Sequence, residues 1–176
     1  MADNVDDRIE VVQGDITTLD VGAVVNAANK QLKRGGGVDG AIHKAAGPKL
    51  QEACDEIGGC PTGQAVVTPG FDLPADYVIH TVGPVYHGGD RNEDSLLESA
   101  YRNSLMRAEN YGIRTVAFPA ISTGVYGYPL SRASHIAVSV ARQWLREHDL
   151  PKKVVFCAFD AATKAAYQAE LSGEEA

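Results

Sequence analysis

The sequence has few cysteines, no long apolar run and no excess of positive charge. Cys54, Cys60 and Cys157 form no C-x-x-C pair and are odd in number, so we expect reduced thiols and neither a zinc site nor a disulfide framework. No apolar segment approaches the ~20 residues that span a bilayer, so we expect no membrane association. The formal net charge of -7 also argues against a nucleic-acid partner, because such binding requires a basic face.

The first ten residues, MADNVDDRIE, lack the basic and apolar regions of a signal peptide, so we expect a cytoplasmic protein. A length of 176 residues suits one domain, and no repeat, low-complexity tract or linker divides the chain. We therefore expect a monomer with one domain over residues 1–176. Its core should span about residues 9–171, with short frayed ends.

Short β-rich runs alternate with segments in which apolar residues recur every three to four positions, as in helices. Asp160 is placed to cap the last of these helices. The alternation predicts an α/β fold with a largely parallel sheet covered on both faces. The predicted strands are residues 9–12, 23–27, 64–68, 77–82, 115–119 and 154–159.

Ligands of such sheets bind beyond the carboxyl ends of the strands. After the first run comes Gly14-Asp15-Ile16-Thr17. Asp15 could accept a hydrogen bond from a base or sugar, or it could cap the turn that follows, and the tetrapeptide alone favours the cap. After the second run, Asn26 and Asn29 could fix the loop backbone, or one of them could hold a ligand hydroxyl.

The next segment contains three successive glycines, Gly35, Gly36 and Gly37. Glycines let the backbone approach a ligand closely and turn several N–H groups towards an anion. A helix predicted from Val38 to Ala46 adds its positive end at the same place, which suits a pyrophosphate. The alternative is a mobile glycine linker, which the apolar helical pattern directly behind it disfavours.

Asp39 and His43 stand four residues apart on this predicted helix and so share one face. The carboxylate could simply favour the helix dipole, or it could orient or activate a water next to the anion site. His43 is better suited to a supporting position behind Asp39 than to the role of base.

A second glycine-hinged loop follows the fifth run and includes Ser122, Thr123, Gly124, Val125 and Tyr126. It resembles a nucleophile elbow but lacks the leading glycine, so we prefer a second set of N–H groups with Tyr126 as a lid. Neither glycine loop matches the fingerprint of a nucleoside triphosphatase or of a Rossmann domain. Phe159 ends the last run, where it could be core or could stack on a base.

In order and spacing, these segments resemble a macrodomain of the MacroD type over about residues 9–171. The motifs that carry the resemblance are GDI at 14–16, VNAAN at 25–29, GGGVDGAIH at 35–43, AAG at 45–47, HTVGP at 80–84 and ISTGVYGYP at 121–129.

The resemblance implies a three-layer α/β/α sandwich around a mixed, mostly parallel six-stranded sheet. It also implies that Asp15 bonds the adenine amino group with the Ile16 main chain beside it, and that Phe159 lies against the adenine. The diphosphate would lie between Gly35–Val38 and Ser122–Tyr126. We place Asn26 among the ligand-binding residues as well, Asn29 at the distal ribose, and Asn29 and Asp39 in the catalytic role.

Members of this type cleave the ester that joins ADP-ribose to acidic protein side chains, and they deacetylate O-acetyl-ADP-ribose. The resemblance therefore predicts a hydrolase that needs no cofactor or metal, with ADP-ribose, O-acetyl-ADP-ribose and mono-ADP-ribosylated proteins as partners. The rival is a reader module that binds ADP-ribose without catalysis, and the presence of both Asn29 and Asp39 speaks against it. One departure is Arg34, which stands where the family usually has a fourth glycine.

Overall fold

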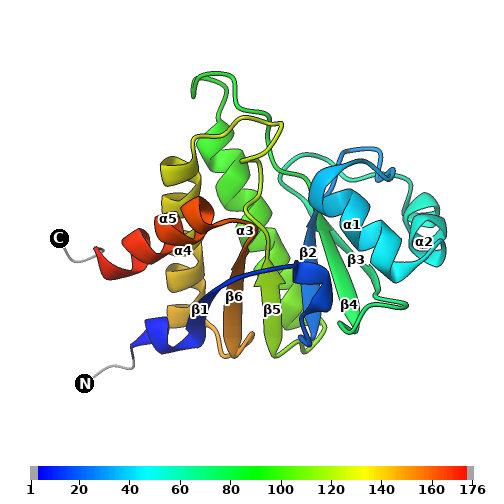
Figure 1. Cartoon of the computed structure of the whole chain (residues 1–176), viewed down its shortest axis with the longest axis horizontal. Helices are drawn as coiled ribbons and strands as arrows, with labels where there is room; N and C mark the ends of the chain where they lie inside the picture. Colours follow the sequence, from blue (N-terminus) through cyan, green and yellow to red (C-terminus); the bar gives the residue numbers. More distant parts are fainter. Residues whose placement is uncertain (1–3, 174–176) are drawn as a thin grey trace.

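The computed structural model of the chain describes residues 4–173 (Figure 1). The outermost residues expected to fray, 1–3 and 174–176, lie outside this range. In chain order the elements are η1 Val5–Arg8, β1 Ile9–Gln13, η2 Ile16–Thr18, β2 Ala23–Ala27, α1 Gly37–Ala46, α2 Lys49–Ile57, β3 Ala65–Pro69, β4 Tyr77–Thr81, α3 Glu93–Asn110, β5 Thr115–Phe118, α4 Leu130–Glu147, β6 Lys153–Ala158 and α5 Ala161–Ser172.

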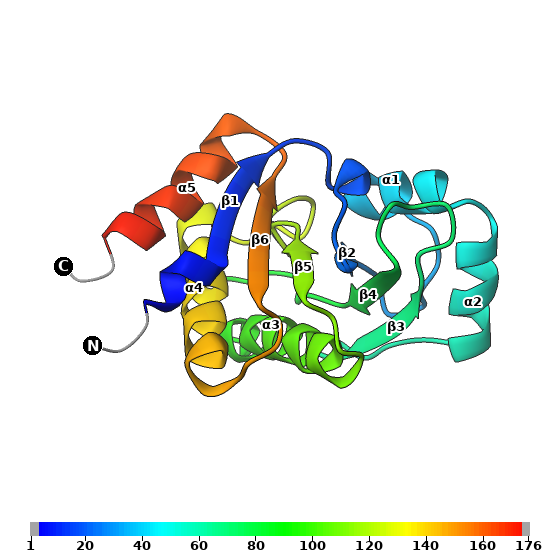
Figure 2. The ribbon, with the colours of Figure 1, turned by 90° about the horizontal axis from the view of Figure 1, so that it is seen from below.

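The six strands form one sheet in the order β1-β6-β5-β2-β4-β3. All neighbouring pairs are parallel except β3 and β4, which are antiparallel. Helices α3 and α4 lie on one side of the sheet and α1 on the other (Figure 2). The predicted three-layer fold with a mixed, mostly parallel sheet is confirmed.

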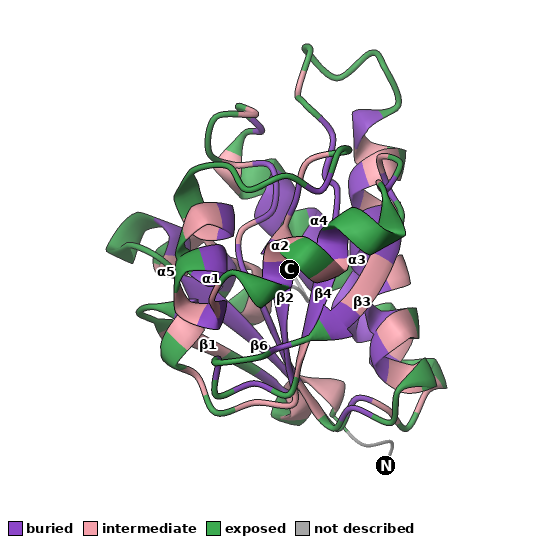
Figure 3. Cartoon of the chain, turned by 90° about the vertical axis from the view of Figure 1, so that its right-hand side faces the viewer, coloured by how far each residue is buried: buried purple, intermediate pink, exposed green. Residues whose placement is uncertain are grey.

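The central strands are largely apolar on both faces because each face packs against a helical layer. Successive residues of β2 illustrate this, since Val24 packs with α1 and α2 whereas Val25 packs with α3 and α4. The same alternation holds for Val155 and Phe156 in β6. Figure 3 shows buried residues along the strands and exposed residues mainly on the outer loops.

The helix predicted for residues 38–46 is present and begins one residue earlier, at Gly37. Asp160 caps α5 as predicted, because its side chain accepts from the Thr163 N–H at 2.9 Å. Helix α2 was not predicted from the sequence. It is short and buries only Leu50 and Cys54, so its apolar pattern is sparse.

The carboxyl ends of β1, β6, β5 and β2 meet at one edge of the sheet, since these strands run parallel. The loops that carry the predicted site residues all leave from this edge. Between residues 4 and 173, no helix is long and apolar enough to cross a membrane.

Candidate functional site

A cavity of about 790 Å³ opens at this edge of the sheet, within the size range of small-molecule sites. Loops after β1, β2, β5 and β6 line it together with the amino end of α1. Most of the sequence-predicted site residues converge here. Those lining the cavity are Asp15, Ile16, Asn29, Gly35, Gly36, Gly37, Val38, Asp39, Ser122, Thr123, Gly124, Val125, Tyr126 and Phe159.

Asp15 caps η2 and also lines the cavity, so both interpretations of this residue describe its position. Its carboxylate accepts from the Thr17 hydroxyl at 2.7 Å and from the Thr17 N–H at 2.9 Å. The hydroxyl and then the N–H lower the pKa of Asp15, so the carboxylate is ionised at neutral pH.

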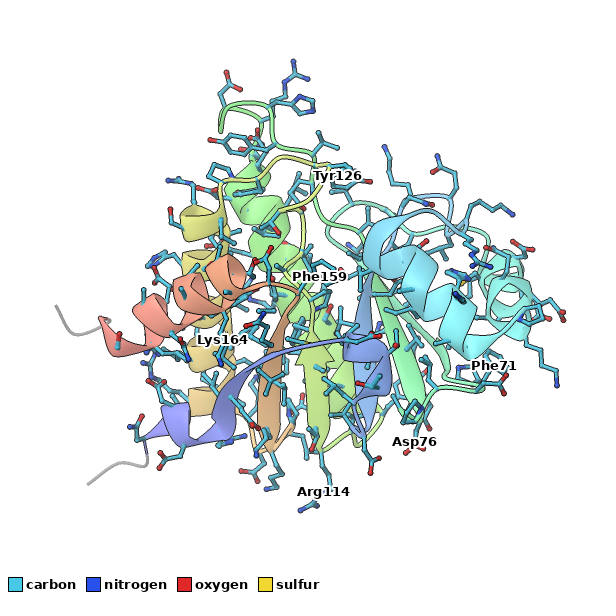
Figure 4. All side chains as sticks on the ribbon, in the orientation of Figure 1. Phe71, Asp76, Arg114, Tyr126, Phe159 and Lys164 are labelled. Atoms are coloured by element: carbon cyan, nitrogen blue, oxygen red, sulfur yellow. The ribbon has the colours of Figure 1, made fainter. Side chains whose placement is uncertain are left out.

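Phe159 is not part of the core, because 88% of its surface is exposed. It lines the cavity just beyond the end of β6, at the same edge of the sheet as Tyr126 (Figure 4). An aromatic ring held in solvent at a cavity rim is free to stack on a planar ligand group.

The glycine run leads into the amino end of α1, and within it the Gly35 N–H is already bonded to the Asp39 carboxylate. Gly36 is the N-cap and brings no side-chain hydrogen bond to the helix, so the first N–H groups are not capped. A Cβ at Gly36 or Gly37 would meet nothing within 4 Å, and Gly37 adopts a φ of +57°. The run is an ordered helix start, and it offers N–H groups and the helix dipole to an anion.

The second loop is held in an unusual backbone conformation at Ser122, a buried non-glycine residue with a φ of +69°. The Ser122 hydroxyl donates to the main-chain carbonyl of Pro84 at 2.8 Å. Because its partner is a carbonyl and not an imidazole, this geometry does not support a serine nucleophile. The carbonyl of Tyr126 accepts from the Tyr86 N–H at 2.9 Å, which ties the loop to the segment after β4.

Asp39 is 7% exposed, yet it reaches the cavity wall. Its Oδ1 accepts from Asn26 Nδ2 at 2.6 Å, and its Oδ2 accepts from the Gly35 N–H at 2.5 Å. Each carboxylate oxygen therefore has a donor, which fixes the direction of the carboxylate.

Asn26 and Asn29, the two asparagines of the NAAN segment, differ in position. Asn29 lines the cavity, and its amide also closes the loop through the Lys33 N–H and carbonyl, at 3.0 and 2.7 Å. The prediction that Asn26 contacts the ligand is wrong. Asn26 is fully buried within β2, where its amide faces Asp39 and His80 and not the cavity.

His43 lies behind Asp39, with its Nε2 3.7 Å from Asp39 Oδ1, and does not line the cavity. Burial lowers the pKa of His43, Asp39 opposes this change, and Arg34 adds to it. The imidazole is therefore neutral at pH 7 and above. This geometry fits the supporting position expected for it.

The cavity lining contains the carboxylates of Asp15, Asp39 and Asp160 but no lysine or arginine. Arg34 is exposed, and its main-chain N–H donates to Gln51 Oε1 at 2.8 Å instead of facing the cavity. An anionic ligand must therefore be held by backbone N–H groups and the α1 dipole. Within residues 4–173, no cluster of His, Cys, Asp or Glu could hold a metal ion.

Several lining residues were not predicted as site residues, since they contribute backbone or small side chains. The motifs of the resemblance contain Ala27, Ala28, Ala41, Gly83 and Ile121 but gave them no role of their own. Spatial proximity alone reveals Pro119, Ala120, Cys157 and Thr163.

Comparison with known proteins places this geometry in a family. The model of the Macro domain matches residues 25–137. An O-acetyl-ADP-ribose deacetylase of Enterobacter cloacae is 55% identical over 169 residues, which is 94% of each chain. A mutant macrodomain of Oceanobacillus iheyensis, solved with ADPR, is 40% identical with a TM-score of 0.93 over 99% of this chain and 98% of that one.

A Trypanosoma brucei macrodomain in complex with ADP-ribose is 41% identical, with a TM-score of 0.88 over 93% of this chain and 69% of that one. Family model, sequence identity and backbone geometry agree over nearly the whole chain. The chain belongs to the Macro domain family.

Proposed function

We propose that this protein binds ADP-ribose and hydrolyses its esters. Its substrates are O-acetyl-ADP-ribose, which it deacetylates, and proteins that carry mono-ADP-ribose on acidic side chains. One observation carries this proposal: a cavity that gathers uncapped backbone N–H groups also holds the Asp39 carboxylate in a fixed direction. The name of the 55% identical deacetylase and the ADP-ribose complex of a related macrodomain support it.

In the proposed complex, the adenine lies at Asp15 and Ile16 and stacks on Phe159, since these lining residues follow the paired ends of β1 and β6. The diphosphate lies between the amino end of α1 and the Ser122–Tyr126 loop, where N–H groups replace its hydration. The distal ribose, which carries the ester, then reaches Asn29 and Asp39.

The proposed reaction is hydrolysis of an ester by a water that Asp39 orients and deprotonates. The hydroxide oxygen bonds to the acyl carbon, the bond from that carbon to the ribose oxygen breaks, and the ribose oxygen takes up the proton that Asp39 removed from the water. The products are ADP-ribose and the free carboxylic acid. Asp39 suits this role because two donors already hold it, so little reorganisation accompanies the reaction.

The alternative is a reader that binds ADP-ribose without turnover. Such a module gains nothing from a carboxylate beside an anionic diphosphate. Two like charges 4 Å apart repel by about 1 kcal/mol in water and by several times more in a desolvated site. The presence of Asp39 in the cavity lining therefore favours the hydrolase.

The test is to incubate the wild type with O-acetyl-ADP-ribose and, separately, with a protein ADP-ribosylated on aspartate and glutamate. Asn29→Ala is compared with Asn103→Ala, whose amide likewise donates to a main-chain carbonyl, that of Gly63 at 2.7 Å, but stands on α3 outside the lining. We expect turnover by the wild type and Asn103→Ala, with a loss on the order of tenfold or more in Asn29→Ala.

Tight ADP-ribose binding in calorimetry without turnover of either substrate would refute the hydrolase and support the non-catalytic reader module. Absence of binding would refute both functions. Turnover of O-acetyl-ADP-ribose alone would restrict the proposal to the deacetylase.

A further inference from the structure

Behind Asp39, away from the cavity, a row of buried polar side chains crosses three strands. Asn26 on β2 contacts Asp39, and His80 on β4 follows, with 3.1 Å between Asn26 Nδ2 and His80 Nδ1. His80 Nε2 then lies 3.0 Å from the Thr68 hydroxyl on β3. Asn26 and His80 are 0% exposed and Thr68 is 3% exposed, so solvent cannot satisfy these groups.

The direction of each hydrogen bond follows from the end of the row. The Thr68 hydroxyl donates to the Pro69 carbonyl at 3.1 Å, so it accepts from His80 Nε2. A neutral imidazole with its proton on Nε2 has an acceptor at Nδ1. That acceptor takes one hydrogen of the Asn26 amide, and Asp39 Oδ1 takes the other.

The Asn26 amide can adopt only this orientation. If it were reversed, its oxygen would face both the Asp39 carboxylate and the Nδ1 lone pair of His80, which are acceptors. In the observed orientation, Asn26 Oδ1 is buried and has no partner among the described residues. Leaving a buried acceptor unsatisfied is unfavourable, which indicates that the direction of the two donors matters to the protein.

The row stays uncharged around neutral pH. Burial and then the neighbouring His43 lower the pKa of His80 to about 3, so the imidazole is neutral. Cys54 Sγ lies 3.9 Å from His80 Nε2, and burial raises the pKa of this thiol to about 11. In this row, uncharged hydrogen-bonding groups therefore stand behind Asp39.

We propose that His80 is a positioning residue of the active site, which acts through Asn26 to keep the Asp39 carboxylate aimed into the cavity. The proposal rests on the function proposed above for Asp39. His80 does not line the cavity, so it touches no substrate and should not contribute to ADP-ribose affinity. Its effect should fall on kcat, because a carboxylate with one loosened oxygen spends less time in the reactive geometry.

The test compares three variants of the full chain. His80→Leu removes the acceptor for Asn26, whereas His80→Asn can return an amide oxygen near the place of Nδ1. Ser104→Ala is the matched control, because Ser104 is also fully buried and hydrogen-bonded, to the Ala100 carbonyl at 2.7 Å, but stands on α3 outside the lining.

With O-acetyl-ADP-ribose, we expect kcat to fall roughly 10- to 100-fold in His80→Leu, with KM and the ADP-ribose Kd within about threefold of wild type. His80→Asn should regain most of the kcat that His80→Leu loses, and Ser104→Ala should have the kcat of the wild type. Equal kcat in His80→Leu and Ser104→Ala, or a parallel loss of affinity and kcat, would overturn the proposal.

A spectroscopic measurement on the wild type tests the row without turnover or variants. The ¹⁵N spectrum of His80 should show a protonated, pyrrole-type Nε2 and an unprotonated, pyridine-type Nδ1, unchanged between pH 5 and 8. The opposite tautomer would overturn the proposal, since Asn26 could not then donate to both neighbours. If the wild type binds ADP-ribose but hydrolyses nothing, the proposed function fails and positioning for catalysis fails with it. The tautomer still shows whether the row is built as described.

Discussion

Replacing Gly83 by alanine should displace the Ser122–Tyr126 loop and so damage both stability and ligand binding. Gly83 is buried directly after β4 and lines the cavity. A Cβ at this position would lie 2.3 Å from Ser122 Oγ and 2.5 Å from Ile121 Cγ2. Ile121 is β-branched and 0% exposed, so neither it nor the backbone of Ser122 can yield easily.

The size of the effect follows from these contacts. Overpacking of a close-packed interior destabilises by about 1–3 kcal/mol. If the Ser122 hydroxyl rotates away, its hydrogen bond to the Pro84 carbonyl is lost, which adds about 0.5–1.5 kcal/mol. A total of about 1.5–4.5 kcal/mol corresponds to a fall in Tm of roughly 3–18 °C for a chain of this length. We also expect ADP-ribose to bind about tenfold more weakly, because the loop moves.

The assay is thermal unfolding by circular dichroism together with calorimetry of ADP-ribose. The matched control for stability is Gly124→Ala in the same loop, where a Cβ would meet nothing within 4 Å, and its Tm should stay within about 2 °C of wild type. Equal Tm values for the two alanine variants would refute the packing argument. A destabilised Gly83→Ala that binds ADP-ribose as tightly as wild type would refute the link between this contact and the ligand loop.

Three further predictions concern the cavity rim, the segment beside it and the far end of the sheet. Phe159→Ala should leave the free energy of unfolding within about 0.5 kcal/mol of wild type, because 88% of the residue is exposed. The same variant should bind ADP-ribose more weakly by about 1–3 kcal/mol in calorimetry. Unchanged affinity would exclude stacking of the ring on the ligand. Burial opposes ionisation of Glu93, but the N–H groups of His87, Arg91 and Gly89 prevail and lower its pKa to about 2, from 4.5. The Glu93 carboxylate thus stabilises the fold above pH ~4.5, and this contribution is lost as pH falls towards 2. Between these pH values, the free energy of unfolding in urea should therefore change less with pH in Glu93→Gln than in wild type. Parallel pH profiles of the two proteins would contradict this. Arg8 donates to five main-chain carbonyls, one in the last turn of α4 and four in the segment that follows this helix. Arg8→Met should therefore destabilise the protein by about 1–3 kcal/mol without changing its affinity for ADP-ribose. Altered affinity would show that the two ends of the sheet are coupled.

The strands and the three longest helices were predictable because their patterns are local. Ala23–Ala27 is apolar on both faces, which indicates a central strand, and β2 has those bounds. The apolar stripe through Leu97 and Leu105 likewise predicts α3. Asp160 was predictable as the N-cap of α5 because its hydrogen bond to the Thr163 N–H spans only four residues.

The sequence failed where long-range contacts decide a residue's role. Asn26 and Asn29 look equivalent in NAAN, and only the burial of β2 between two layers keeps Asn26 away from the cavity. His80, the partner of Asn26 on β4, is 54 positions away, and Thr68 on β3 contacts that histidine, so no local pattern reveals the row. Similarly, Arg34 stands beside the cavity in sequence but contacts α2 through its main chain.

The most direct test of the account is the release of acetate from O-acetyl-ADP-ribose by wild type and by Asp39→Asn, each with its ADP-ribose affinity measured in parallel. We expect the wild type to turn over and the variant to lose at least about 100-fold in kcat, or roughly 2.7 kcal/mol. Its affinity for ADP-ribose should not fall, because the exchange removes a negative charge beside the diphosphate. A variant that keeps wild-type kcat would contradict the role of Asp39 as the group that acts on water.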